Sequence, residues 1–145
     1  MRFPFRTGKH APIAGEDQAR VIAAILETPE GHGGRTDNLC GPEERSYQEW
    51  IARLSSLLGR EIRYEVTSDD ETREVFAGWY GEFPAQHIVA VAKDYNSGLF
   101  SGTDQVIEKF TRKKPMSFDE FIGQNLSLYN HEKSALLGRS ASQKR

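Results

Sequence analysis

A tyrosine and a lysine near the carboxyl end of the chain have the spacing of a proton-transfer pair. Tyr129 and Lys133 lie four residues apart, and a lysine near a tyrosine can lower the pKa of the phenol, so that it exchanges a proton with a substrate. The chain holds five tyrosines, and a spacing of this kind arises often by chance. We therefore interpret both residues as surface positions of the last helix and assign no catalytic residue.

The other reactive side chains are not grouped in the sequence. The four histidines are scattered, and Cys40 has no second thiol at the spacing of a zinc site. We therefore predict no metal site. Glu16 and Asp17 are adjacent carboxylates, but neighbouring side chains diverge in direction, which does not suit paired acid and base work. Asp17 stands where a helix needs an N-cap, and we interpret it as that cap.

Aromatic side chains gather in the middle of the chain. Phe76, Trp79 and Tyr80 recur at helical spacing, and Phe83 and His87 follow them. Aromatic residues in such a pattern either pack in a core or line a pocket for an apolar ligand. The residues alone leave both interpretations open.

Helices are the main elements that must position these residues. Apolar residues at helical spacing predict a first helix over residues 18–26, which ends at the prolines and glycines of residues 29–34. Ser46 and Glu49 form a capping box that predicts the start of a second helix, and Gly59 supplies its left-handed stop. Further helices are predicted to begin near Ser68, Pro84, Thr103 or Asp104, and Ser117.

Two short segments are predicted to be strands. Residues 61–66 alternate apolar and charged side chains, which is typical of a strand with one solvated face. Residues 36–40, between a glycine-rich loop and a turn, are a second candidate. The sequence thus predicts an α/β chain with a few short strands and about five helices. We expect residues 1–138 to form one lobe and residues 139–145 to be a polar, flexible tail.

Composition excludes several kinds of partner. A net charge of -2 gives no basic field for contacts with phosphate backbones, so we expect no nucleic-acid binding. No apolar stretch approaches the roughly 20 residues that span a bilayer, and the amino terminus lacks the apolar run of a signal peptide. We therefore expect no membrane insertion. The single cysteine suits a reducing compartment, and a cytoplasmic location is the expectation.

Five blocks, in order along the chain, resemble the NmrA-like branch of the atypical short-chain dehydrogenases, an NAD(P)-binding family. The resemblance extends from about Phe3 to Tyr129, and the order and spacing of the blocks carry it more than any single block does. The blocks are residues 9–26, Gly41-Pro42-Glu43, residues 57–64, residues 94–104 and residues 115–121.

The resemblance implies the carboxy-terminal, substrate-side part of a Rossmann-type protein, because in this family such blocks follow the dinucleotide-binding half. That half opens with a glycine-rich turn between a strand and a helix. Gly31-His32-Gly33-Gly34 instead follows a predicted helix and precedes a predicted strand. We therefore expect the nucleotide-binding half to be absent, with no cofactor for this chain alone and NADP(H) for the full-length family.

The resemblance also assigns the aromatic region to a substrate lobe that faces the nicotinamide and accepts an apolar or quinone-like ligand. We also consider His10, in the loop before the first helix, as a candidate. The candidate substrate-binding residues are His10, Phe76, Trp79, Tyr80, Phe83 and His87.

Three functions follow from this resemblance. The first is a lobe that is not catalytic alone and acts through a partner, and the second is part of an NAD(P)H-dependent oxidoreductase for a small molecule. The third is an independent ligand-binding or dimerisation module. Helix faces that cover the nucleotide domain in the family are uncovered without it. We therefore expect a homo-oligomer or a Rossmann-domain partner.

Overall fold

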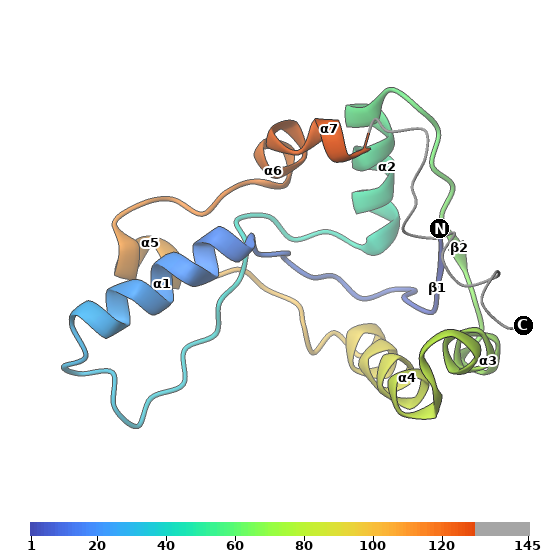
Figure 1. The fold of residues 1–145 in the computed structure, drawn as a ribbon, viewed down its shortest axis with the longest axis horizontal. Helices are drawn as coiled ribbons and strands as arrows, with labels where there is room; N and C mark the ends of the chain where they lie inside the picture. The colour runs from blue at the N-terminus through green and yellow to red at the C-terminus, as the bar shows by residue number, and fades with distance from the viewer. Residues whose placement is uncertain (130–145) are drawn as a thin grey trace, which may run out of the picture.

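Helices carry the architecture of residues 1–129, the part of the chain that this computed structural model describes (Figure 1). Strands β1 (Arg2–Phe3) and β2 (Glu65–Val66) pair in parallel as a two-stranded sheet. The predicted α/β class with few, short strands is confirmed. The helices are α1 (Gly15–Glu27), α2 (Tyr47–Leu58), α3 (Asp69–Tyr80), α4 (Glu82–Asn96), α5 (Val106–Thr111), α6 (Phe118–Gln124) and α7 (Leu126–Tyr129).

Two predicted capping boxes are confirmed, and each fixes the start of a helix. At α2 the Ser46 hydroxyl accepts the Glu49 amide, and the Glu49 carboxylate accepts the Ser46 amide at 2.7 Å. Ser117 and Glu120 make the same pair of bonds at the start of α6. Gly59 ends α2 in the left-handed conformation, with φ of 63°. Local sequence signals therefore set both ends of α2.

Asp17 is not the N-cap of α1, contrary to the prediction from the sequence. The helix begins at Gly15, and Asp17 is a buried residue of its first turn. The Asp17 carboxylate pairs with Arg20 and accepts the amide of Met116 at 2.7 Å. It therefore ties α1 to the segment before α6, a long-range role that a local capping rule does not reveal.

The strands are shorter than predicted. Residues 36–40 form no strand, and of residues 61–66 only the last two pair. Strands require hydrogen bonds to a neighbour, and within the described range β2 has β1 as its neighbour in the sheet. The alternation of residues 61–66 therefore predicts an extended segment correctly but not the pairing that makes it a strand.

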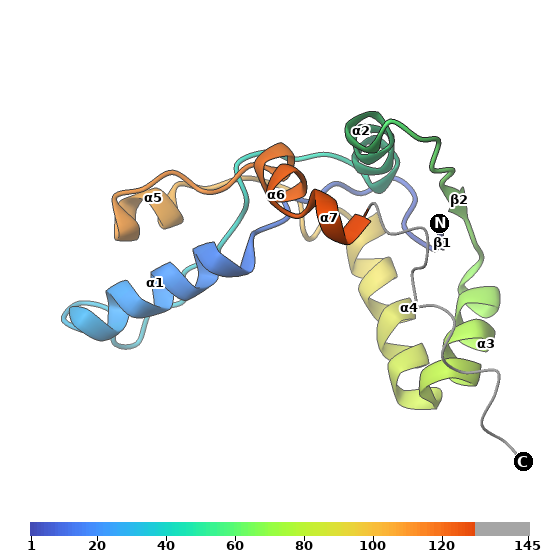
Figure 2. The ribbon, with the colours of Figure 1, turned by 45° about the horizontal axis from the view of Figure 1, so that its top comes forward.

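The helices pack in pairs and enclose a small core (Figure 2). Helix α3 lies against α4, α1 against α5, and α2 against α6. A buried cluster of Phe5, Ala92 and Tyr95 joins α4 to the amino-terminal segment.

Within the described range, no helix has the length and apolar character needed to cross a bilayer. Large apolar side chains stay exposed on each helix pair: Ile22, Leu26, Val75, Trp79, Tyr80, Phe83 and Phe121.

Side chains hold the first part of the extended segment between β1 and α1. Asn96, the last residue of α4, donates from Nδ2 to the Pro4 carbonyl at 3.0 Å and accepts the Arg6 amide at 2.7 Å. Gly8 passes so close to α4 that a Cβ there would lie 1.9 Å from the Tyr95 carbonyl oxygen. The segment is therefore fixed to the last turn of α4, which also sets the position of the residues that follow it.

Replacement of Asn96 by alanine should destabilise the fold. It removes both bonds and leaves two backbone groups without their partner, so we expect the free energy of unfolding to fall by about 1–3 kcal/mol. Urea unfolding measures this loss as a shift in midpoint. Gln86→Ala, which removes a bond on the exposed face of α4, is the matched control and should cost less than about 0.5 kcal/mol. Equal, small losses for both variants would show that Asn96 does not anchor the segment.

Candidate functional site

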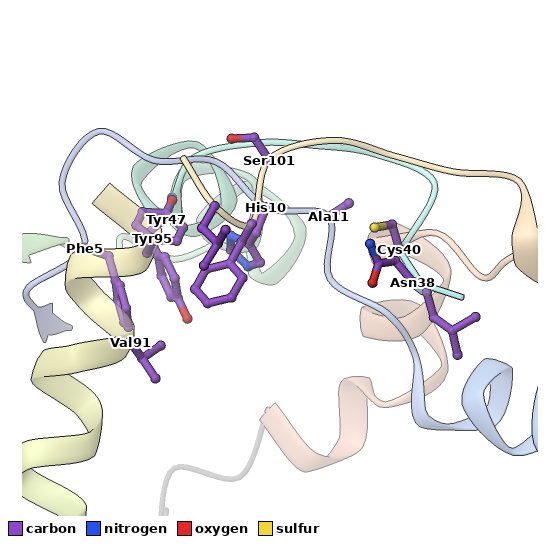
Figure 3. Close-up of a pocket in the computed structure, with 12 residues that line it drawn as sticks. Phe5, His10, Ala11, Asn38, Cys40, Tyr47, Val91, Tyr95 and Ser101 are labelled. Atoms are coloured by element: carbon purple, nitrogen blue, oxygen red, sulfur yellow. The ribbon is translucent and has the colours of Figure 1, made fainter. Parts of the chain in front are cut away.

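A hollow of about 620 Å³ lies where the extended segment, α2 and α4 meet (Figure 3). Its lining comes from the extended segment, residues 38–40, the start of α2, the last turns of α4 and residues 99–101. Small-molecule sites occupy roughly 300–1,000 Å³ and are mostly apolar with a few polar groups. The hollow has this size and this kind of lining, and it is the candidate functional site.

Stacked rings build one wall of the hollow. The Tyr47 ring stacks on Phe5, with 4.4 Å between centroids and 9° between planes, and also on His10 at 4.9 Å. Tyr95 meets all three rings edge-on, at centroid distances of 5.0–5.6 Å. Such aromatic pairs each contribute about 0.5–1.5 kcal/mol beyond the burial of their area. The wall is therefore a packed, rigid surface.

The tyrosine hydroxyls at this wall bond the backbone. Tyr95 accepts the amide of Tyr47 at 3.0 Å, and Tyr64 donates to the carbonyl of Phe5 at 2.7 Å. Burial raises the pKa of Tyr47 and of Tyr95, and it raises the pKa of Tyr64 to about 12. The three phenols therefore stay protonated at neutral pH. They supply ring surface and structural hydrogen bonds and do not act as bases.

His10 lines the hollow and carries a buried polar atom without a partner among the described residues. Its backbone pairs with that of Arg45 through two bonds of 3.1 Å, and its carbonyl accepts the indole N–H of Trp50 at 3.3 Å. The imidazole Nδ1 is buried and has no hydrogen-bond partner within the described range. Burial lowers the pKa of His10 below its ordinary value of 6.5, so the ring is neutral at pH 7. A neutral imidazole offers one donor and one acceptor, which suits an uncharged ligand that bears oxygen.

Cys40 lines the hollow opposite the aromatic wall (Figure 3). Burial raises the pKa of the Cys40 thiol, and the neighbouring Asp104 carboxylate raises it further. A thiol that stays protonated is a weak nucleophile. Across the described residues, no three His, Cys, Asp or Glu side chains converge to hold a metal ion. The hollow is therefore arranged for binding by contact and hydrogen bonding.

The substrate-binding residues predicted from the sequence lie in two places, the hollow and the α3–α4 hairpin. His10 lies in the hollow, and the other five do not line it. Phe76 is half-buried, and its ring centroid lies 6.5 Å from that of Phe3. The Phe83 side chain, in contrast, is 82% exposed. The binding role of these five residues stays a prediction. We call them the hairpin set, since they lie on the α3–α4 hairpin: Phe76, Trp79, Tyr80, Phe83 and His87.

Sequence reasoning missed three residues of the aromatic wall, namely Phe5, Tyr47 and Tyr95. Two of them stand at the end of a helix: Tyr47 opens α2, and Tyr95 lies in the last turn of α4. Aromatic residues at helix ends were the available signal. Tyr129 and Lys133 were interpreted as surface positions, and Lys133 and the tail of residues 139–145 lie outside the described residues.

Comparison with known proteins shows likeness to reductases over part of their length. No family model matches the sequence. The (4-alkanoyl-5-oxo-2,5-dihydrofuran-3-yl)methyl phosphate reductase of Streptomyces griseus is 26% identical over 124 residues, which are 84% of this chain and 44% of that protein. The chain therefore spans less than half the length of this curated relative.

Solved structures show the same partial likeness. The NADPH-dependent quinone oxidoreductase of Escherichia coli, in complex with NADPH, matches with a TM-score of 0.77 at 16% identity, over 87% of this chain and 44% of that one. The triphenylmethane reductase of Citrobacter sp., in complex with NADP(H), gives 0.72 at 21% identity, over 86% and 43%. A nucleoside-diphosphate-sugar epimerase of Staphylococcus aureus gives 0.74 at 24%, over 84% and 42%. The chain therefore has the fold of one part of these proteins, as the NmrA-like resemblance predicted.

The described residues do not fit the dinucleotide that such proteins bind. A pyrophosphate is held by free amides at the amino terminus of a helix, next to a glycine-rich turn. Helices α1 to α4 each carry a carboxylate in the first turn, which repels phosphate. At α2 the Glu49 carboxylate and the Ser46 hydroxyl also occupy amides of that turn. The glycines of residues 31–34 follow α1 and lead into no helix.

Titration with nucleotide tests this misfit. We expect no binding heat when the purified 145-residue chain is titrated with NADPH or NADP+ in a calorimeter, because these helix ends offer no site for phosphate. An intact reductase with a Rossmann domain serves as the positive control. Micromolar binding by the chain would contradict the prediction.

The lowered pKa of His10 makes stability depend on pH. Between the folded pKa and the ordinary value of 6.5, the unfolded chain binds more protons than the folded chain, so the free energy of unfolding falls as the pH drops through this window. We expect the wild-type chain to lose more stability than His10→Gln between about pH 7 and about pH 5. Urea midpoints at several pH values measure the difference. The control is His87→Gln, a change at an exposed position, whose urea midpoints should depend on pH as those of the wild type do. Parallel curves of midpoint against pH for all three proteins would refute the role of His10 in this pH dependence.

Proposed function

We propose that this chain is the substrate-binding lobe of an NmrA-like, NAD(P)H-dependent reductase, and that its hollow receives a small, flat, uncharged molecule of the quinone type. The aromatic wall with the neutral His10 imidazole is the observation that carries the proposal. A separate Rossmann half supplies the reduced nucleotide. The single cysteine supports a cytoplasmic location.

The wall favours flat rings. The Tyr47 ring stacks on Phe5 and on His10, and a conjugated ring can stack in the same way on an accessible ring of this wall. The His10 imidazole can hydrogen-bond a carbonyl oxygen without the cost of burying a charge. Two of the structural neighbours are named for quinone and triphenylmethane substrates, both of which are ring compounds.

The lobe is not catalytic by itself under this proposal. A hydride must come from the nicotinamide, and the helix ends of the chain do not fit its pyrophosphate. Exposed apolar residues such as Leu26 on α1 and Leu128 on α7, at 75% and 72% exposure, support a further body that covers them. A nucleotide-binding half is favoured over a second copy because the chain spans less than half of each reductase.

The hairpin set supports a second candidate site. Trp79, Tyr80 and Phe83 are 60%, 62% and 82% exposed, and exposed aromatic groups mark binding surfaces. This site would serve an independent ligand-binding or dimerisation module. The first site is preferred because its residues line a hollow of about 620 Å³.

Direct binding of a quinone separates the two sites. The probe is naphthoquinone with methyl groups at both free positions of its quinone ring. These methyl groups prevent addition of the Cys40 thiol. We expect the 145-residue chain to bind this dimethylnaphthoquinone in a calorimeter, and His10→Ala to weaken binding by about tenfold, as expected for the loss of one hydrogen bond and one stacked ring.

Trp79→Ala is the matched variant in the hairpin set and should leave the affinity unchanged, provided that circular dichroism shows both variants folded. A loss with Trp79→Ala but not with His10→Ala would move the site to the α3–α4 hairpin. Absence of binding by the wild-type chain would refute the proposed substrate class.

A further inference from the structure

Two apolar side chains stand exposed at the edge of the hollow. Leu99 and Phe100, in the turn after α4, are 68% and 41% exposed, and both line the same hollow as His10. The other exposed large apolar residues lie on the helices, at Val66 of β2 and at Met1, and do not line it. These two side chains therefore differ from the rest, because a ligand in the hollow can cover them.

The turn that carries them has a defined shape. The Leu99 amide donates to the Asp94 carbonyl and the Ser101 amide to the Gly98 carbonyl, each at 3.0 Å. Gly98 and Gly102 bracket the turn with φ of 84° and 116°, values that favour glycine. The turn is thus a fixed continuation of α4, and its two apolar side chains are presented at a set place.

One short segment holds both sides of the hollow. The Glu44 carboxylate accepts the Gly102 amide at 2.6 Å, while the next residue, Arg45, pairs with the backbone of His10. Adjacent residues therefore anchor the turn of Leu99 and Phe100 on one side and His10 on the other. The distance between the apolar edge and the polar imidazole is fixed by this segment.

We propose that Leu99 and Phe100 are specificity-determining residues, which select substrates with a second fused ring or an alkyl branch beyond the ring that stacks at His10. This inference rests on the proposed function. A fused second ring adds apolar surface to the ligand, and contact of this surface with Leu99 and Phe100 removes apolar area from water on both partners, which is favourable. A single-ring quinone has less apolar surface to bury against them.

A pair of quinones tests the selection. Duroquinone has one ring, and dimethylnaphthoquinone has two. Neither has a hydrogen on its quinone ring, so neither is attacked by the Cys40 thiol. Calorimetry on the 145-residue chain should give tighter binding of the naphthoquinone by about tenfold, the discrimination that a hydrophobic pocket reaches for a small apolar group. Leu99→Ala and Phe100→Ala should each weaken naphthoquinone binding severalfold and leave duroquinone binding unchanged. The ratio of the naphthoquinone affinity to the duroquinone affinity should therefore fall.

The control is Leu26→Ala, a change at an exposed leucine of α1 outside the hollow, which should keep the wild-type ratio. A ratio that stays at the wild-type value in Leu99→Ala and Phe100→Ala overturns this inference while the proposed function stands. Binding of neither quinone by the wild-type chain overturns both. Circular dichroism of each variant confirms that a changed ratio does not come from unfolding.

Discussion

The last turn of α4 holds the amino-terminal segment in place, and the hollow depends on this contact. With a sheet of only two residues per strand, the segment before α1 has backbone groups that no strand satisfies, and such groups need partners. Asn96 supplies two of these partners, and Tyr95 packs against the ring of Phe5 and accepts the amide of Tyr47. A shift of α4 would therefore disturb the wall beside His10.

The same turn also continues into the edge of the hollow. Tyr95 belongs to the wall and Leu99 to the edge, only four residues later, and the Leu99 amide returns to the Asp94 carbonyl inside the helix. Shape and chemistry of the hollow are therefore set by one stretch of chain, whose direction comes from the packing of α4 on α3. Substitutions at the α3–α4 contact are thus expected to act on binding through position, without contact to the ligand.

Local rules predicted the parts of the fold that rest on local interactions. The capping box of Ser46 needs only residues within one helical turn, and it was predicted correctly. Asp17 was assigned wrongly because its partner Met116 lies 99 positions away, which no local pattern records. Tyr47 and Tyr95 were missed for the same reason, since their hydrogen bond spans 48 positions. His10 was a candidate from the sequence, and in the structure it lines the hollow.

In the proposed reductase, the substrate and the nucleotide have opposed needs. A pyrophosphate requires free helix amides and cationic or neutral surroundings, whereas the helices of this chain begin with carboxylates that compete for those amides. A flat apolar substrate requires a dry aromatic wall, which Tyr47 and Phe5 provide. Tight sites bury roughly 70–90% of a ligand, and Leu99, at the edge of the hollow, is still 68% exposed. In the proposed reductase, a nucleotide-binding half that closes over the hollow would therefore bind more tightly when substrate is present, and by linkage the substrate would bind more tightly to the joined halves.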